Sequence, residues 1–222
     1  MGVCRLLFQY NTSFCSIKNT IIDSEHNGSG TDLWDILETI DKQQFVDPLT
    51  LQEHFWNVFV VDAFLGNFDR HNGNWGILVD EENQTAEIAP VYDCGSCLYP
   101  QLAAEDMKSV LEDENQINKR IFTFPTSAVE EEEKKISYFE FISSLKNEDC
   151  NEALKRIYKR IDLEKINRLI EETPFIEPVQ KDFYQVMLKE RKEKILDYSM
   201  KLLLVQEKQM GQEEEASPIQ SM

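Results

Sequence analysis

The sequence predicts an α+β fold in which a mixed first half precedes an all-helical second half, and two patterns support this prediction. The first is a pair of short, β-prone segments, residues 75–79 and 85–92, separated by the polar run DEENQ, as expected for a β-hairpin. The second is the charged stretch beyond about residue 105, where apolar residues recur at helical spacing. A small hairpin joined to a larger helical body follows from the two.

The first 31 residues are expected to be a lead-in of short strand-like pieces that ends in the turn-rich loop SEHNGSGTD. Thr31 or Asp32 can cap the helix that follows, because a short polar side chain accepts hydrogen bonds from the first free N–H groups. The apolar stripe of this helix is Leu33, Ile36, Leu37 and Ile40. A second helix begins near Thr50 and is apolar on nearly every face from residue 55 to 65. We therefore expect it in the centre of the core.

Three later segments, SYFEFISSL, CNEALKRIYKRI and LEKINRLIEE, carry helical stripes, and a long last helix is expected from near Lys181 to about Gln206. The run EEEE at 130–133 is expected to begin a solvated helix, since carboxylates favour a helix N-terminus and lysines follow four residues later. The predicted organisation is a lead-in over 1–31, one domain over 32–206 and an acidic, flexible tail over 207–222.

Composition excludes several classes of protein. The formal net charge of -18 argues against a direct nucleic-acid partner or an anionic membrane surface, since both require a basic footprint. The five cysteines are irregularly spaced, which favours a reduced, cytoplasmic setting. We see no signal peptide and no apolar run of about 20 residues, so a soluble protein without a membrane partner is expected. An acidic protein that binds a nucleotide would need a divalent cation between carboxylates and phosphates.

The segment from residue 66 to 96 carries the chemistry. In the predicted hairpin, one strand runs outward from Asn74 and the other returns to Asp93, so both residues lie at the same open end. Asp69 precedes Asn74 by five residues, in a glycine-containing loop. Two carboxylates and one amide oxygen are therefore expected to converge. Phosphoryl transfer needs a proton acceptor, here Asp69, and oxygen ligands for Mg²⁺, here Asn74 and Asp93. The alternative is that these residues only shape a turn, where Asp and Asn are common.

The blocks DRHNGNWG and IAPVYDCGSCLYP, in this order and spacing, resemble the catalytic core of the bacterial HipA-type serine/threonine kinases, in particular their HipA-like C-terminal domain. The resemblance implies a protein kinase-like fold, mainly the helical C-terminal lobe with a small β-hairpin at the catalytic site. It implies ATP and Mg²⁺ as cofactors and a protein substrate, with Asp69 as the catalytic base and Asn74 and Asp93 as the magnesium ligands. The DRH-x-x-N pattern also occurs in phosphatidylinositol kinases, which leaves a lipid kinase as a further alternative.

The chain departs from the kinase pattern at its start. It has no G-x-G-x-x-G loop, no P-loop and no recognisable strand lysine, and only about 50 residues precede the second helix. We therefore expect an incomplete N-terminal lobe, which a separate N-lobe or an antitoxin-type partner would complete. The same observation motivates the alternative of a catalytically inactive interaction module that keeps the kinase-like lobe.

For each of the remaining candidate residues, a structural role is the alternative to a functional one. His71 is expected to organise the loop by hydrogen bonds rather than to transfer a proton. For Arg70, support of a phosphate and pairing with an acidic neighbour stay equally open. Cys94 and Cys97 form a C-x-x-C without a second metal-ligand pair, so ordinary buried thiols are the favoured interpretation. The tryptophans are expected to be core or lobe-packing anchors: Trp34, Trp56 and Trp75.

Overall fold

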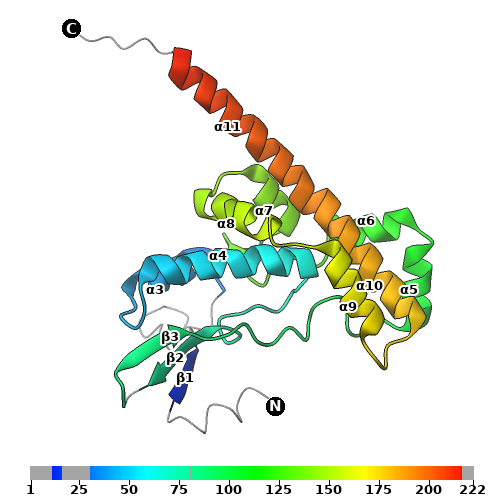
Figure 1. The fold of residues 1–222 in the computed structure, drawn as a ribbon, viewed down its shortest axis with the longest axis horizontal. Coiled ribbons are helices and arrows are strands. Elements are labelled where there is room, and N and C mark those ends of the chain that lie inside the picture. The colour runs from blue at the N-terminus through cyan, green and yellow to red at the C-terminus, as the bar shows by residue number, and fades with distance from the viewer. Residues whose placement is uncertain (1–11, 17–30, 81, 217–222) are drawn as a thin grey trace.

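The computed structural model describes residues 12–16, 31–80 and 82–216. Most of the expected lead-in and the last six residues of the expected tail lie outside this range. Figure 1 shows the arrangement of the elements. In chain order they are β1 (Thr12–Ser16), α3 (Leu33–Lys42), α4 (Pro48–Leu65), β2 (Gly76–Asp80), β3 (Thr85–Ile88), α5 (Ala104–Leu111), α6 (Glu114–Phe122), β4 (Glu130–Glu131), β5 (Lys134–Lys135), α7 (Tyr138–Ser144), α8 (Glu148–Tyr158), α9 (Leu163–Glu172), α10 (Pro178–Arg191), the π-helix η1 (Lys192–Asp197) and α11 (Tyr198–Ala216).

A three-stranded antiparallel sheet in the order β1-β2-β3 lies on one side of α4, and α7 and α8 lie on the other (Figure 1). The predicted hairpin is present, with Ile77 opposite Ile88 and Asp80 opposite Thr85, but its returning strand ends at Ile88 and not at residue 92 as predicted. Helices α5, α6, α9 and α10 gather beyond the C-terminal end of α4. The α+β prediction, with a helical second half, is confirmed by this architecture.

Both helices of the first half begin where a side chain caps them. The Asp32 carboxylate accepts hydrogen bonds from the backbone N–H groups of Trp34 at 2.9 Å and Asp35 at 3.3 Å, and Asp47 does the same for Thr50 at 2.8 Å. Of the two roles predicted for Trp34, the core anchor was wrong, because its side chain is 73 % exposed, and the lobe-packing anchor stays a prediction. The reason is its position, since it follows Leu33 and therefore points away from the stripe that buries α3.

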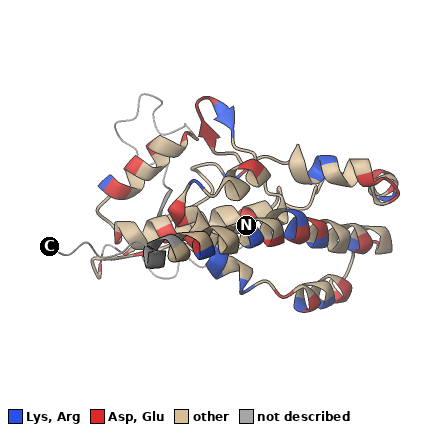
Figure 2. Ribbon diagram, turned by 90° about the horizontal axis from the view of Figure 1, so that it is seen from above, with Lys and Arg blue, Asp and Glu red and all other residues tan. Residues whose placement is uncertain are grey.

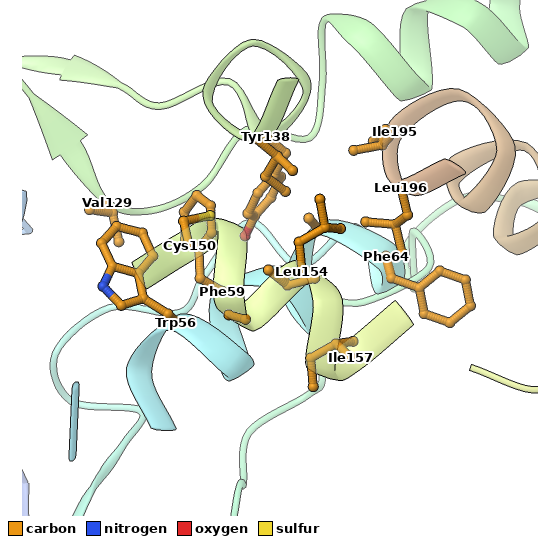
Figure 3. Packing of buried hydrophobic residues seen from close by; sticks show 14 of the residues in the cluster. Trp56, Phe59, Phe64, Val129, Tyr138, Cys150, Leu154, Ile157, Ile195 and Leu196 are labelled. Carbon is orange, nitrogen blue, oxygen red and sulfur yellow. The ribbon is translucent and has the colours of Figure 1, made fainter. Parts of the chain in front are cut away.

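The core is centred on α4, which is apolar around its circumference as predicted. Trp56, Val60 and Ala63 are completely buried on this helix, and Trp75 is buried beyond its end. Figure 3 shows how side chains of α4 meet those of α7, α8 and η1, with Phe59 facing the Tyr138, Cys150 and Leu154 group. A helix buried on all sides is a rigid platform for whatever its C-terminal end carries.

The prediction of a helix at residues 130–133 was wrong. The chain forms the two-stranded hairpin β4–β5, in which Glu130 lies opposite Lys135 and Glu131 opposite Lys134. Figure 2 shows the resulting pair of one acidic and one basic strand. Opposite charges that would support a helix four residues apart support a hairpin equally well when they face each other across strands. Long-range contact decides the outcome, because the Glu130 N–H donates to the Thr31 carbonyl at 2.8 Å.

The C-terminal helical rod is longer than predicted. Helical backbone continues from α10 through η1 into α11 and ends at Ala216, ten residues beyond the predicted end at Gln206. The outer part of α11 projects away from the body in Figure 1. Within the described residues, no helix combines the length and the apolar character needed to cross a membrane.

Candidate active site

The loop that carries Asp69 starts at the end of α4. Gly66 ends this helix in the left-handed conformation, with φ of 69°, and its N–H donates to the Asp62 carbonyl. A side chain at this position would be strained by the backbone and would also approach Pro125 Cγ to 3.1 Å. Asn67 follows, and its N–H also donates to the Asp62 carbonyl, at 3.0 Å. The loop therefore leaves a rigid helix in a fixed direction.

A buried ion pair anchors the loop to α4. Arg70 Nε donates to Asp62 Oδ2 at 2.9 Å and Arg70 Nη2 donates to Asp62 Oδ1 at 3.1 Å, so the contact is bidentate. The side chains of Asp62 and Arg70 are only 2 % and 7 % exposed. Asn67 Nδ2 donates to Asp62 Oδ1 at 2.9 Å, which satisfies the carboxylate further. Burial opposes the charge on Arg70, but the hydrogen bonds and negative charge of Asp62 outweigh it and raise the Arg70 pKa.

The same guanidinium joins the two blocks of the predicted site. Arg70 Nη1 donates to the Asn74 carbonyl at 3.1 Å and also to the Tyr92 carbonyl. Arg70 Nη2 contacts Cys94 Sγ at 3.5 Å. The backbone beside Asp93 is thus held next to the loop that carries Asp69 and Asn74. Of the two roles left open for Arg70, pairing with an acidic residue is the one that the structure shows.

Asp69 and Asn74 are locked to each other through the backbone. Asn74 is buried, and its side-chain nitrogen donates to the Asp69 carbonyl at 2.7 Å. The Asp69 N–H donates to Asn67 Oδ1 at 3.1 Å, whereas the Asp69 side chain is exposed. With its nitrogen engaged, the Asn74 amide directs its oxygen away from that carbonyl. The loop therefore fixes the backbone tightly and presents the Asp69 carboxylate to solvent.

Asp93 lies at the open end of the hairpin, next to this loop. Its side chain is exposed, and its backbone is left-handed, with φ of 52°. The preceding Tyr92 donates its hydroxyl to the Gly73 carbonyl at 2.6 Å, which ties the returning strand to the loop. Burial, together with the negative charge of Asp93, raises the pKa of Tyr92 to about 12 against the opposing charge of Arg70. The phenol hence stays protonated and keeps donating at neutral pH.

His71 and Gly73 shape the tip of the loop. The Gly73 N–H donates to His71 Nδ1 at 3.0 Å, and His71 is exposed. A Cβ atom at Gly73 would lie 2.8 Å from His71 Cε1, so a larger residue would displace the imidazole. This contact agrees with the predicted loop-organising role of His71.

The prediction of two buried thiols was wrong for Cys94, which is exposed, while Cys97 is half-buried. β3 ends at Ile88, so Cys94 lies in the turn region beyond the sheet and not within a covered strand. Across residues 12–16, 31–80 and 82–216, no group of three or more His, Cys, Asp or Glu side chains is arranged to hold a metal ion. The site predicted from the sequence is not a group of this kind, because one of its three residues is Asn74, which has an amide side chain.

Sequence reasoning missed Asp62 and Asn67, which position the loop without belonging to either motif. Asp62 is the sole charged residue in the apolar stretch 55–65. A carboxylate in a helix buried on every face requires a partner, and this signal was available in the sequence. Asn67 also has a carbonyl that accepts the Tyr138 hydroxyl at 2.7 Å, which connects the loop to α7. Only the fold could reveal that contact.

Comparisons with known proteins agree with this geometry. A family model described as HipA-like C-terminal domain matches residues 10–170. Among curated proteins, a Helicobacter pylori protein named serine/threonine-protein kinase CtkA is 48 % identical over 185 residues, which are 83 % of this chain and 57 % of that protein. The chain thus spans little more than half the length of this relative.

A solved structure shows the same fold. The crystal structure of a proinflammatory kinase CtkA from Helicobacter pylori matches with a TM-score of 0.86 and 41 % identity, over 89 % of this chain and 73 % of that one. The expected kinase-like, mainly helical C-terminal lobe is confirmed by this match. Because the family model covers well over half of the chain, the chain belongs to the HipA-like C-terminal domain family.

Proposed function

We propose that this chain is the catalytic lobe of an ATP- and Mg²⁺-dependent serine/threonine kinase, which transfers the γ-phosphoryl group of ATP to a hydroxyl of a protein substrate. The observation that carries the proposal is the contact of one buried guanidinium, that of Arg70, with the carbonyls of both Asn74 and Tyr92. It brings the loop of Asp69 and Asn74 against the strand end that carries Asp93. The family and the name of the Helicobacter relative support the same reaction.

The donor set suits magnesium. Asp93 contributes an exposed carboxylate, and Asn74 contributes an amide oxygen whose nitrogen is engaged elsewhere. Hard oxygen ligands of this kind, few in number and at an open rim, leave room for water and phosphate oxygens around Mg²⁺. Asn74 and Asp93 would hold the ion, which would supply positive charge that offsets the negative charge of the phosphates during transfer.

Of the remaining residues, one is proposed to accept the proton and the others hold the loop in position. Asp69 presents its carboxylate to solvent from a backbone held at both its N–H and its carbonyl, so it is positioned to accept the proton of an incoming hydroxyl. Asp62 and Arg70 do not reach the reacting atoms in this proposal. They hold the Asp69 loop and the Asp93 strand end in register, and His71 keeps the tip of the loop closed.

A complete ATP site needs more than this lobe. The sequence lacks a glycine-rich loop and a recognisable strand lysine, so we propose that this lobe alone holds Mg·ATP through Asn74 and Asp93 and that a separate N-lobe or an antitoxin-type partner completes the nucleotide pocket. A bacterial, cytoplasmic setting with ATP in supply belongs to the same proposal.

The test is transfer of labelled phosphate from ATP to generic acceptor proteins, with full-length chain and Mg²⁺. Asp69→Asn should lower the rate by about 10²- to 10⁴-fold, the usual contribution of a general base, and should leave Mg·ATP binding in place. Asp106→Asn, at an exposed position on α5, is the matched control and should behave like the unmodified chain.

Transfer that survives Asp69→Asn would overturn the assignment of the base. Nucleotide binding without any transfer would favour the interaction module, and labelling of phosphoinositide vesicles alone would favour a lipid kinase.

A further inference from the structure

Two cysteines lie at the two ends of the turn that follows Asp93. The Cys97 N–H donates to the Cys94 carbonyl at 3.2 Å, so the residues between them form a β-turn. The ends of such a turn have Cα atoms less than about 7 Å apart, and disulfides span about 4.4 to 6.8 Å between Cα atoms. Cys94 is also among the groups that raise the pKa of Cys97, as expected for two thiols that lie close together. The two cysteines are therefore close enough for a disulfide to form with an adjustment confined to the turn.

The two thiols differ in access. Cys94 is exposed, and Arg70 Nη2 contacts its sulfur at 3.5 Å. Cys97 is half-buried, and burial raises its pKa to about 12. An accessible thiol beside a second, shielded thiol is the arrangement of sensor and resolving cysteines. Cys150, by contrast, is buried in the core and has no such access.

The turn between the thiols is fixed at both ends. On one side, Arg70 holds the Tyr92 carbonyl, and on the other, the Leu98 N–H donates to the Leu65 carbonyl at 3.1 Å. The Asp93 carboxylate lies over the turn, since a Cβ atom placed on Gly95 would be 3.7 Å from Asp93 Oδ1. Any change of shape between the fixed ends therefore falls on the turn and on the carboxylate that rests on it.

We propose that Cys94 and Cys97 are a reversible dithiol–disulfide site, and that closing the disulfide displaces Asp93 and weakens Mg·ATP binding. The oxidant is hydrogen peroxide. The exposed thiol of Cys94 attacks the peroxide, the O–O bond breaks, and water leaves as the sulfur becomes a sulfenic acid. The Cys97 sulfur then attacks the sulfenic sulfur, so that the S–S bond forms, the S–O bond breaks and a second water leaves. Two thiols are oxidised by two electrons and one peroxide is reduced to two waters. A thiol reductant reverses the step.

The first test locates the disulfide and does not depend on the kinase proposal. Reduced full-length chain is treated with hydrogen peroxide, blocked with iodoacetamide and digested with trypsin without reduction. The peptide 71–108 contains Cys94 and Cys97 and no other cysteine. It should lose two hydrogen masses and escape alkylation, and dithiothreitol should restore both thiols. A peptide 71–108 that stays alkylated on both cysteines would overturn the proposal.

The second test measures Mg·ATP binding by calorimetry and rests on the proposed function. The oxidised chain should bind about tenfold more weakly than the reduced chain, comparable to the loss of a contact that orients a metal ligand. Cys97→Ser should abolish this dependence on peroxide, whereas Ser96→Ala, in the same turn but with both thiols present, should retain it. Equal binding by both redox forms would overturn the link to Asp93. Should reduced chain bind no Mg·ATP at all, the proposed function fails, while the peptide map still decides whether the disulfide forms.

Discussion

Two buried arginines hold the end of α4 in different ways. Arg70 binds the side chain of Asp62, and Arg191 binds the carbonyl of the next residue, Ala63, through Nε at 2.7 Å. Arg191 is completely buried, and its Nη1 donates to the Arg120 carbonyl, also at 2.7 Å. No ion pair within the described ranges includes Arg191, and burial lowers its pKa. One guanidinium is paired with a carboxylate, and the other donates hydrogen bonds to carbonyl groups and has no counter-ion among the described residues.

This difference indicates that Arg70 positions the candidate active site, whereas Arg191 holds helices together. The carbonyls that Arg191 contacts lie in the last turns of α4 and α6, where the helix dipole is negative and intrahelical partners are missing. Arg191 therefore joins three helix ends, including that of α10, and no loop depends on it. Arg70 has its charge compensated at Asp62, so its remaining N–H groups are available to hold the candidate active site together. We infer that the two arginines support different properties of the protein.

The largest difference between the two arginines is expected for Asp62→Ala, which removes the counter-ion of Arg70 and leaves the contacts of Arg191 in place. It leaves the Arg70 charge buried without a counter-ion, so the free energy of unfolding should fall by about 3–5 kcal/mol. Mg·ATP binding should be lost as well, since Arg70 no longer holds the loop in place. Urea unfolding and calorimetry measure the two effects.

A surface pair on the same helix is the matched control. Glu53 approaches Arg156 at 3.5 Å with both side chains partly exposed, and Glu53→Ala should cost about 0–1 kcal/mol and leave binding intact. A similar loss from both alanine variants would show that the Asp62 contact has no special role.

The second prediction concerns Arg191→Met. The Ala63 carbonyl loses its side-chain donor, which costs about 1–3 kcal/mol, whereas the Arg120 carbonyl keeps the Tyr99 hydroxyl as a donor at 2.9 Å. Removal of an uncompensated buried charge offsets part of this cost. We expect a net loss of about 2 kcal/mol in the free energy of unfolding, with Mg·ATP affinity much less affected than by Asp62→Ala. Arg168→Met, at an exposed position on α9, should change stability by less than about 0.5 kcal/mol. Loss of binding at full stability would contradict the separation of roles.

The smallest expected effect is a dependence of folding stability on pH, and it involves only residues around Arg70. His54 lines a cavity of about 10 Å³ together with Asp62, Arg70 and Tyr138. Burial, and then the charge of Arg70, lower the His54 pKa below its ordinary value of 6.5. The unfolded chain consequently binds more protons in mild acid, so stability should begin to fall as the pH drops below about 6.5. His54→Gln should flatten this slope between pH 7 and 5, and an unchanged slope would rule out His54 as its source.

The sequence alone was sufficient to predict the buried helix and the hairpin that support the candidate active site. An apolar run on every face of a helix can only be buried, and the prediction for residues 55–65 followed from that alone. The hairpin was likewise predictable, because its strands and turn agree with local propensity. Its closure then determined that Asn74 and Asp93 share one end. Where local preference and the fold coincide, a single sequence is sufficient.

The remaining features depend on contacts between distant segments. Glu130 and Glu131 favour a helix locally, but pairing with Thr31 and with the lysines opposite them produces a hairpin. The exposure of Cys94 follows from where the strand ends, which no local pattern encodes. The roles of Asp69, Asn74 and Asp93 in catalysis stay predictions that rest on chemistry and family.

Binding of a paramagnetic substitute for Mg²⁺ tests the central claim most directly. In the presence of ATP, Mn²⁺ should bind the full-length chain, and electron paramagnetic resonance should show about 10- to 100-fold weaker binding after Asp93→Asn. Asp69→Asn should bind as the unmodified chain does, and so should Glu87→Gln, an exposed carboxylate on β3 of the same hairpin. Equal Mn²⁺ affinity in Asp93→Asn and the unmodified chain would contradict the account, because the strand end held by Arg70 would then contribute no ligand.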